Sequence, residues 1–392
     1  MHLLRVQVPD FRGLKNIDIT FEKDFFPSIF PLGSQNGGGK STLLQLIFVL
    51  LHCSVDEDKK PFLQNLLQGL KVSEGEDKRV LAIIDIWDGK KIVNLEFFYN
   101  KISILKYLLG YRDKNINPKE LSDRDIDEDI NSEIVIDICH LSTEIENLLD
   151  NKKIIKITKL QCHLNNQSKA QSQLFLETIS HKIFLAAPST QVFLFLPPDS
   201  RKLLFSNSSN GDKNYYEILE SARYELAGLF TYDFLAVELL IESFKAARDR
   251  DFREAIKTGS YGNSYQTLID DLNMLLGNKK INLNEDFSGV NFQLDNNGET
   301  IELYPEDLSH GELKRLSIYI WLKSRNIEDA IVLMDEVEIA FHPDWQYQII
   351  SDLKDWAPSN QYILATHSYA LCEALTPAHV KEIEPKLIKQ ES

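Results

Sequence analysis

The chain has 392 residues, of which 43% are hydrophobic, and a formal net charge of −16. Its longest apolar run, residues 43–53, is shorter than the roughly 20 residues that span a bilayer, and residues 1–5 lack the features of a signal peptide. Length and composition therefore exclude a membrane-spanning or membrane-bound protein and predict a globular cytoplasmic one.

The acidic balance also bears on partners. Proteins that grip duplex DNA usually present a basic surface, so general DNA binding is not the default, although a local patch could form at Lys152, Lys153, Lys156 and Lys159. The densest acidic stretch, residues 123–129, is interpreted as a solvated loop, with a docking surface for a basic partner as the alternative. The four cysteines are far apart and predict neither a zinc site nor a disulfide framework.

In chain order, apolar alternation predicts strands or hairpins at residues 3–8, 17–21, 29–32, 79–87, 91–98 and 289–303. Residues 41–53 predict an apolar helix, and residues 215–278 have helical periodicity. Residues 113–150 are charged and predict irregular structure, whereas residues 183–196 predict a buried strand interrupted by a loop. Helices then alternate with apolar strands at residues 330–334 and 362–366, which indicates an α/β sheet.

A glycine-rich loop lies between the strand at 29–32 and the following helix. Glycines let main-chain N–H groups face an anion, and the helix N-terminus adds a partial positive charge. A lysine at the end of such a loop reaches the β- and γ-phosphates, and the next hydroxyl ligates Mg²⁺. One departure is that Ser34 stands where the strict spacing requires glycine. The phosphate-binding residues so predicted are Asn36, Gly37, Gly38, Gly39, Lys40, Ser41 and Thr42.

The apolar run at 330–334 ends in Asp335 and Glu336. Acids at the carboxyl tip of a buried parallel strand emerge where α/β sheets bind ligands. We expect Asp335 to hold Mg²⁺ through water and Glu336 to polarise the attacking water, because phosphoryl transfer depends on placement and charge neutralisation.

Leu308-Ser309-His310-Gly311-Glu312 precedes another apolar helix. By itself this segment reads as a helix start, with Ser309 as N-cap and Glu312 completing a capping box. Its place before the carboxylate strand, in a chain with a phosphate loop near its start, favours a functional interpretation. Ala365-Thr366-His367-Ser368 follows the last strand, and Phe11-Arg12-Gly13-Leu14 forms a turn near the N-terminus.

Together these segments resemble an ABC-type ATPase of the RecF, SMC and overcoming-lysogenisation-defect branch. The resemblance covers roughly residues 1–50 and 300–370, and it also includes Glu338 and the His342-Pro343 step after the carboxylates. It implies an ABC-type P-loop nucleotide-binding domain with a mixed sheet, an antiparallel β subdomain and a helical lobe. The expected core is discontinuous, residues 1–112 with 300–392. Between its two parts we expect an irregular acidic insertion with β elements at 113–182, and a segment at 183–299 that runs from a loop to the helical lobe and leads to the Ser309 segment.

The same resemblance implies that two subunits pack head to tail around two ATP molecules. Ser309 and Gly311 of one subunit would then contact the γ-phosphate bound by Lys40 of the other, and His367 would sense that phosphate. A glutamine that joins Mg²⁺ to the helical lobe is expected at Gln191, with Gln161 as the alternative. Two further residues, Glu312 and Arg12, are assigned to nucleotide binding.

The function of the ATPase is less constrained. His310 and Glu312 replace the glycine and glutamine of transporters, which argues against a transporter subunit. Residues 54–300 show no nuclease motif, and 25 residues after His367 leave no room for a nuclease domain. The chain resembles the ATPases of anti-phage systems such as Septu, PARIS and certain retrons, which implies a sensor or scaffold that controls a separate nuclease or toxin. The alternatives are a RecF-like repair ATPase that binds DNA and a scaffold with negligible turnover.

Overall fold

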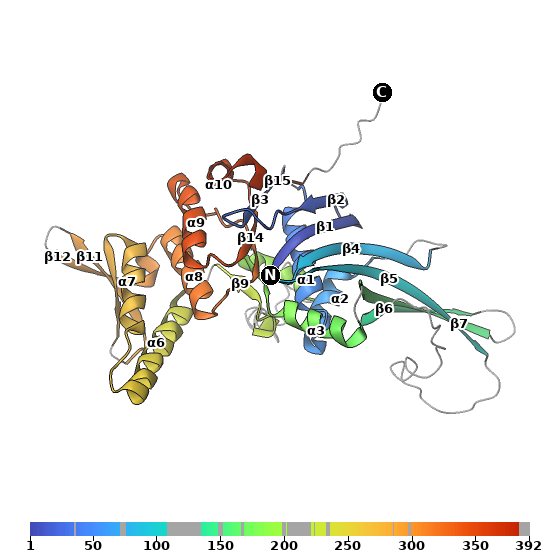
Figure 1. The fold of residues 1–392 in the computed structure, drawn as a ribbon, viewed down its shortest axis with the longest axis horizontal. Coiled ribbons are helices and arrows are strands. Elements are labelled where there is room, and N and C mark those ends of the chain that lie inside the picture. Colours follow the sequence, from blue (N-terminus) through green and yellow to red (C-terminus); the bar gives the residue numbers. More distant parts are fainter. Residues whose placement is uncertain are drawn as a thin grey trace, which may run out of the picture.

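A computed structural model describes residues 1–34, 37–70, 76–107, 135–147, 152–165, 168–197, 201, 221–222, 224–232, 236–284, 286–296 and 299–383. Within these residues the strands form two six-stranded sheets and one three-stranded sheet. The parallel sheet lies in the middle of the molecule, with a helical lobe at one end and long antiparallel strands at the other (Figure 1). This arrangement is the mixed α/β fold predicted from the sequence.

The parallel sheet carries the segments expected to bind nucleotide. Its strand order is β15 (Lys381–Glu382), β3 (Ile29–Gly33), β14 (Gln361–Ala365), β13 (Ile331–Asp335), β8 (Ile183–Ala187) and β9 (Leu229–Thr231). Side chains alternate along β13, so that Ile331 and Leu333 join one hydrophobic core and Val332 and Met334 join the other. Burial on both faces explains why this strand is apolar throughout.

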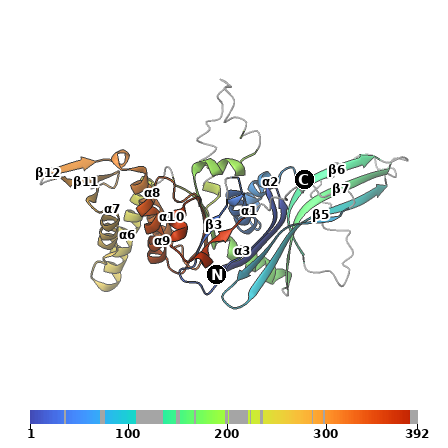
Figure 2. The same cartoon turned by 90° about the horizontal axis from the view of Figure 1, so that it is seen from above.

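The antiparallel sheet lies beside the first core. Its order is β2 (Leu14–Thr20), β1 (His2–Phe11), β4 (Lys78–Trp87), β5 (Ile92–Tyr107), β7 (Lys152–Leu164) and β6 (Val135–Asn147). The predicted hairpin at 79–98 is confirmed, because β4 pairs antiparallel with β5, and Gly89 in the turn between them has a φ of 103°. Strands β5, β6 and β7 extend away from the parallel sheet (Figure 2).

Helices cover both faces of the parallel sheet. On the first core lie α1 (Lys40–His52), α2 (Lys60–Leu67) and α3 (Lys169–Ser180), with the 3-10 helix η3 (Ser189–Phe195). A short 3-10 helix, η1 (Glu57–Lys59), leads into α2. On the second core lie α8 (His310–Ser324) and α9 (Pro343–Trp356), and α10 (Tyr369–Glu373) packs on α9.

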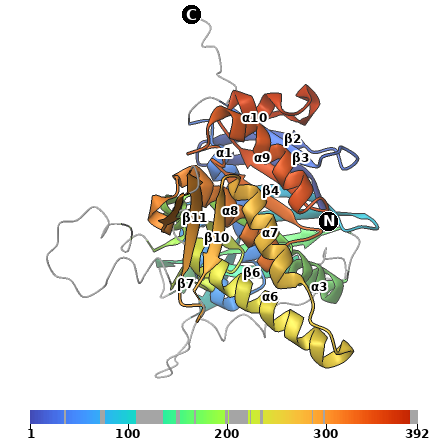
Figure 3. The same ribbon diagram turned by 90° about the vertical axis from the view of Figure 1, so that its left-hand side faces the viewer.

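The helical lobe packs on α8. It consists of α6 (Ala236–Thr258), α7 (Ser264–Leu276) and a small sheet of β10 (Lys279–Leu283), β11 (Val290–Asn296) and β12 (Glu299–Leu303). Figure 3 shows α6 and α7 in front of α8 when the molecule is viewed from this end. Two 3-10 helices complete the described chain, η4 (Pro305–Asp307) before α8 and η5 (Pro377–His379) before β15.

Three predicted elements differ from the structure. The irregular prediction for 113–150 is wrong at residues 135–147, which form β6 against β7, whereas the acidic stretch 123–129 lies outside the described residues. The strand predicted at 183–196 ends at Ala187 and continues as η3. Within the predicted helical block, Leu229–Thr231 is instead a strand, because it pairs in parallel with β8 at the sheet edge.

Candidate functional site

Four predicted residues follow neighbouring strands of the parallel sheet. Lys40 follows β3, His367 follows β14, Asp335 ends β13, and Gln191 follows β8. Parallel strands present their carboxyl ends at one edge, and ligands bind α/β sheets at that edge. The order β3-β14-β13-β8 therefore brings together segments separated by more than 300 residues of sequence.

The phosphate loop uses left-handed glycines where it turns into α1. Gly37 has φ 80° and Gly39 has φ 87°, values that side-chain-bearing residues rarely adopt. Gly39 is the N-cap of α1, and neither a side-chain cap nor an acidic residue occupies the first turn. The first main-chain N–H groups of α1 therefore have no side-chain partner at the cap, as an incoming phosphate requires. Of the predicted loop residues, Asn36 lies outside the described residues.

Lys40 is held across the loop by Ser34, the residue that departs from the usual motif. Its Nζ donates to the Ser34 carbonyl oxygen at 3.1 Å and to the Ser34 Oγ at 3.0 Å. It also lies 3.4 Å from the Nδ1 of His367. Burial lowers the pKa of Lys40, although the Glu338 and Asp335 carboxylates oppose that shift. Of these two Ser34 contacts, the one to Oγ depends on the serine side chain, whereas a glycine would also offer the carbonyl oxygen.

Ser41 and Asp335 meet as a hydroxyl–carboxylate pair. The Ser41 Oγ donates to Asp335 Oδ1 at 2.9 Å, whereas Oδ2 is buried and has no hydrogen-bond partner. Asp335 is 2% exposed, and burial raises the pKa of its carboxyl to about 7 despite the Ser41 hydrogen bond. Hydroxyl and carboxylate oxygens are the donors Mg²⁺ prefers, and a cation would satisfy the unpartnered oxygen. The residues present therefore fit the magnesium ion that the phosphate loop implies.

Glu336 begins a strained turn immediately after β13. Its φ is 52°, and its N–H donates to the Ala365 carbonyl at the end of β14 at 2.9 Å. Its own carbonyl accepts from the Nζ of Lys314, a buried residue of α8, at 2.9 Å. Left-handed backbone at a non-glycine residue costs energy and persists where the surroundings hold it. These contacts hold the Glu336 main chain beside Asp335, with its side chain only partly buried.

Glu338 joins the carboxylate segment to the His367 loop. Its Oε1 accepts from the main-chain N–H of His367 at 2.7 Å, and its Oε2 is buried without a partner. Because the His367 side chain is exposed and lies next to Lys40, this contact fixes the His367 loop beside the phosphate loop. Glu338 had no predicted role, and its position two residues after Glu336 is the signal in the sequence that could have identified it.

Gln191 lies on η3, where the side-chain amide of Gln45 donates to it. Gln45 is on α1, one helical turn after Ser41, and its side chain is 2% exposed. The alternative residue, Gln161, lies in β7 of the antiparallel sheet and bonds there to Asn100 and Asp137. The structure therefore places Gln191, and not Gln161, beside the helix of the phosphate loop.

Ser309 and Glu312 form the capping box at the start of α8. The Ser309 Oγ accepts from the Glu312 N–H at 3.2 Å, and Glu312 Oε2 accepts from the Ser309 N–H at 2.9 Å. Glu312 also pairs with Lys279 of β10. Burial would raise the pKa of Glu312, but the hydrogen bonds from Lys279 and Ser309 outweigh it and lower that pKa. The prediction that this segment begins a helix with a capping box is thus confirmed, and Ser309 is exposed at the surface.

Gly311 allows α8 to approach the segment after β13. A Cβ at this position would lie 2.8 Å from the Ala340 carbonyl oxygen and 3.3 Å from the Trp345 ring. Contacts this short require the neighbouring backbone to move. Glycine is therefore needed here for close packing within the chain, whatever Gly311 contacts in a second copy.

Arg12 points to the end of α2. Its Nη2 donates to the Leu66 carbonyl at 2.7 Å, and its guanidinium lies 5.3 Å from the centre of the Phe11 ring. The same turn contributes Leu14, whose side chain covers Gly39 of the phosphate loop. The turn thus borders the loop, while the Arg12 charge is directed to a neighbouring cavity.

A family model described as "AAA domain, putative AbiEii toxin, Type IV TA system" matches residues 35–373. The chain belongs to this family. The match runs from the phosphate loop through the carboxylate strand to the helix after His367. Together with the geometry above, it identifies the chain as a member of a family of AAA-domain ATPases.

The similarity to individual proteins is lower or covers less of the chain. Over 54 residues the chain is 39% identical to "Retron Vc95 probable ATPase" of Vibrio cholerae serotype O1 biovar El Tor, a match that covers 14% of this chain and 10% of that protein. The chain thus matches about a tenth of that relative's length. Among solved structures, an SMC head bound to the C-winged helix domain of ScpA has a TM-score of 0.43 at 12% identity. The SMC head domain from Thermotoga maritima has a TM-score of 0.44 at 9% identity, and each alignment covers 95% of this chain and 92% of the other.

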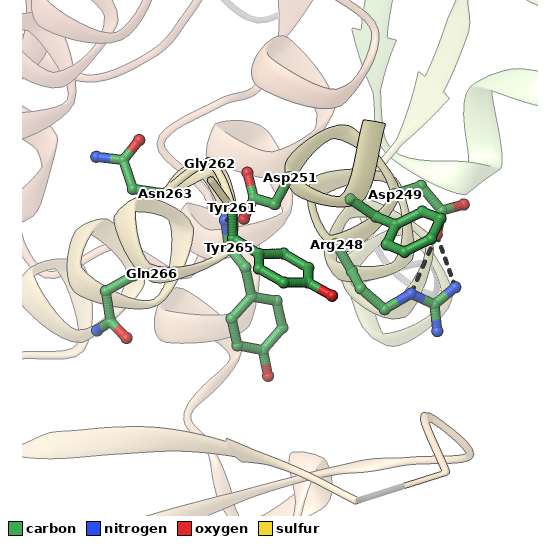
Figure 4. A pocket seen from close by; sticks show the side chains of 9 residues that line it. Arg248, Asp249, Asp251, Tyr261, Gly262, Asn263, Tyr265 and Gln266 are labelled. Atoms are coloured by element: carbon green, nitrogen blue, oxygen red, sulfur yellow. Dashed lines mark hydrogen bonds and ion pairs between the residues drawn. The ribbon is translucent and has the colours of Figure 1, made fainter. Parts of the chain in front are cut away.

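Other features of this AAA-family ATPase lie away from the phosphate loop. A cavity of about 600 Å³ lies at the α6–α7 hairpin and is lined by residues such as Arg248, Phe252 and Tyr261 (Figure 4). It contains none of the predicted site residues. In the described part of the chain, no helix is both long and apolar enough to cross a membrane.

Proposed function

We propose that the chain binds and hydrolyses Mg²⁺·ATP at the Lys40 site and dimerises head to tail around the nucleotide. The observation that carries this proposal is the pairing of Ser41 with Asp335, in which a buried carboxylate oxygen has no partner. Burying such a group is unfavourable unless a ligand completes it. A site that stays incomplete in the free chain is a reason to expect the metal and phosphate that complete it.

Each residue has a defined role in this proposal. Lys40 and the α1 N-terminus would bind the terminal phosphates, Ser41, Asp335 and Gln191 would hold Mg²⁺, and Glu336 would orient the attacking water. When bound, Mg²⁺ would neutralise charge on the phosphates. His367 would contact the terminal phosphate from the loop that Glu338 fixes.

Dimerisation would complete the site from the other side. Ser309 is exposed at the N-terminus of α8, and its hydroxyl, which caps the Glu312 N–H in the free chain, would turn to the phosphate. We propose that Ser309 and Gly311 of one subunit face the γ-phosphate held by Lys40 of its partner.

Two variants test the ATPase. Lys40→Ala should abolish ATP binding, whereas Lys90→Ala, which removes an exposed lysine between β4 and β5, should not. Glu336→Gln should bind ATP but stall hydrolysis, so that ATP-loaded dimers accumulate in light scattering. Unchanged ATP affinity in Lys40→Ala would refute the phosphate-loop assignment, and wild-type turnover in Glu336→Gln would refute the role of that carboxylate.

We further propose that the ATPase is the sensor or scaffold subunit of an anti-phage system and controls a separate nuclease or toxin. Family membership and the short match to a retron ATPase support this role. The test is phage challenge of cells that carry the gene with its genomic neighbours: protection should be lost in Glu336→Gln. Protection that persists in the absence of the neighbouring genes would contradict control of a separate effector. ATP-dependent, salt-sensitive DNA binding by the purified chain would instead favour a repair role.

A further inference from the structure

A second cavity, of about 450 Å³, is lined by Arg12, Asn65, Gln68 and Arg201. It is formed where the β1–β2 turn and Arg201 meet the C-terminal end of α2. Two of its four lining side chains are cationic and the other two are amides. A cavity with this lining offers hydrogen-bond donors and positive charge to a ligand.

Both guanidinium groups are anchored at the same helix end. Arg12 Nη2 donates to the Leu66 carbonyl at 2.7 Å, and Arg201 Nη2 donates to the Asn65 carbonyl at 3.4 Å. The C-terminus of a helix carries partial negative charge, so it attracts cations. Each guanidinium has five N–H donors, and among the described residues these contacts use one donor of each.

The two charges lack an anionic partner among the described residues. Neither arginine forms an ion pair there, and Arg201 Nε is buried without a hydrogen-bond partner. Elsewhere in the chain, Arg315 forms a two-pronged pair with Asp352 at 2.6 and 2.8 Å. Burial, together with the neighbouring Arg201 charge, lowers the pKa of Arg12. Two like charges in one cavity are unfavourable without a counter-ion, which a bound anion would supply.

The walls of the cavity connect it to the phosphate loop. The turn that carries Arg12 also carries Leu14, which packs on Gly39. The Asn65 side-chain amide donates to the Phe195 carbonyl at 3.0 Å, at the end of the η3 segment that contains Gln191. An anion held in the cavity would therefore lie between two segments that also border the ATP site.

We propose that Arg12 and Arg201 form an oxyanion subsite for a phosphate group. Planar guanidinium groups bind phosphate through paired N–H donors, and two arginines that line one cavity suit a doubly charged oxyanion. The phosphate belongs either to the nucleotide at Lys40, in which case the inference rests on the function proposed above, or to a second phosphorylated ligand. Arg201 has no other role in the proposed function, so its variants isolate this subsite.

The experiment measures ATP and inorganic pyrophosphate binding to the full chain by calorimetry. Arg201→Gln should weaken the binding of at least one of these two ligands by about tenfold or more, the scale of a charge-assisted hydrogen bond. Arg201→Lys, which keeps the charge but loses the paired donors, should give an intermediate affinity. Arg5→Gln is the control, because Arg5 is already paired with Asp18 at 2.6 Å on an exposed surface.

The Lys40→Ala background separates the two sources of phosphate. If pyrophosphate still binds to Lys40→Ala and is lost in the double variant with Arg201→Gln, the subsite takes a second ligand. If Lys40→Ala removes all binding, and Arg201→Gln weakens ATP binding when Lys40 is present, the phosphate is that of the nucleotide. If Arg201→Gln leaves both affinities within about twofold of Arg5→Gln while its unfolding midpoint is unchanged, the subsite does not exist. Failure of the ATPase proposal is distinguishable, because it would appear as unchanged ATP affinity in Lys40→Ala.

Discussion

Asp335→Asn should stabilise the chain in the absence of metal and nucleotide. Asp335 is 2% exposed, and burial raises the pKa of its carboxyl from 3.8 to about 7. Because the folded-state pKa lies above the unfolded-state value, the unfolded chain ionises first as the pH rises. Folding stability therefore falls between about pH 4 and pH 7, and the full penalty is present above pH 7. An asparagine removes the charge but keeps an oxygen that can accept the Ser41 hydrogen bond.

The magnitude follows from the difference between the two pKa values. At roughly 1.4 kcal/mol per pH unit, a pKa moved from 3.8 to about 7 corresponds to at most roughly 4 kcal/mol. We expect Asp335→Asn to raise the free energy of unfolding by about 1–4 kcal/mol at pH 8, because relaxation of the site and its remaining hydrogen bond reduce the gain. The gain should be about 1 kcal/mol smaller at pH 6, where the folded carboxyl is largely protonated.

Urea unfolding in EDTA at pH 6 and pH 8 measures this effect, and Asp355→Asn, an exposed acid of α9, is the matched control. The same variant should lose most of the stabilisation that Mg²⁺·ATP confers on the wild type, because the metal loses a ligand charge. The reasoning fails if Asp335→Asn destabilises the metal-free chain equally at both pH values, or if Mg²⁺·ATP still stabilises it as well as it stabilises the wild type.

Two further substitutions test the packing of α8. Gly311→Ala places a Cβ 2.8 Å from a main-chain oxygen and should cost about 1–3 kcal/mol of unfolding free energy in urea; Gly13→Ala, with no atom within 4 Å, should cost much less, and equal costs would contradict the packing argument. Lys314→Met removes two hydrogen bonds to main-chain carbonyls and should lower kcat more than ATP affinity, because Glu336 loses its main-chain support. Lys323→Met, on the exposed side of α8, should retain wild-type kcat, and a Lys314→Met enzyme that does so too would exclude this role.

Features that depend on local pattern were predictable from the sequence. The run from Ala330 to Glu336 combines a fully buried strand with acids at its tip, and both requirements appear as consecutive letters. The turn at Gly89 and the capping box at Ser309 are likewise set by residues within four positions of one another. Such elements form where the local preference and the tertiary environment agree.

Features that depend on distant partners were not predictable. Strand β6 lies in a charged segment for which the sequence predicts irregular structure. It is a strand because 11 of its residues pair with β7. Gln45 and Lys314 are buried polar residues whose partners lie more than 20 residues away. Glu338 looks like one of many acids until the fold brings the His367 loop to it. A single sequence carries no signal for these contacts, because each partner is chosen by topology.

In the proposed dimer, helix α8 contacts both nucleotide sites. The N-terminus of α8 would face the phosphate held by the partner subunit, whereas Lys314 of the same helix holds the Glu336 carbonyl in its own chain. If α8 shifts when it binds the partner's nucleotide, Lys314 would move with it. The shift would therefore change the position of Glu336, which orients water at the nucleotide of its own subunit. Coupling of this kind is reciprocal for binding, so each nucleotide would favour the other. Because Lys314 lies between the two sites, removing its contacts should reduce the cooperativity of ATP binding and not merely its strength.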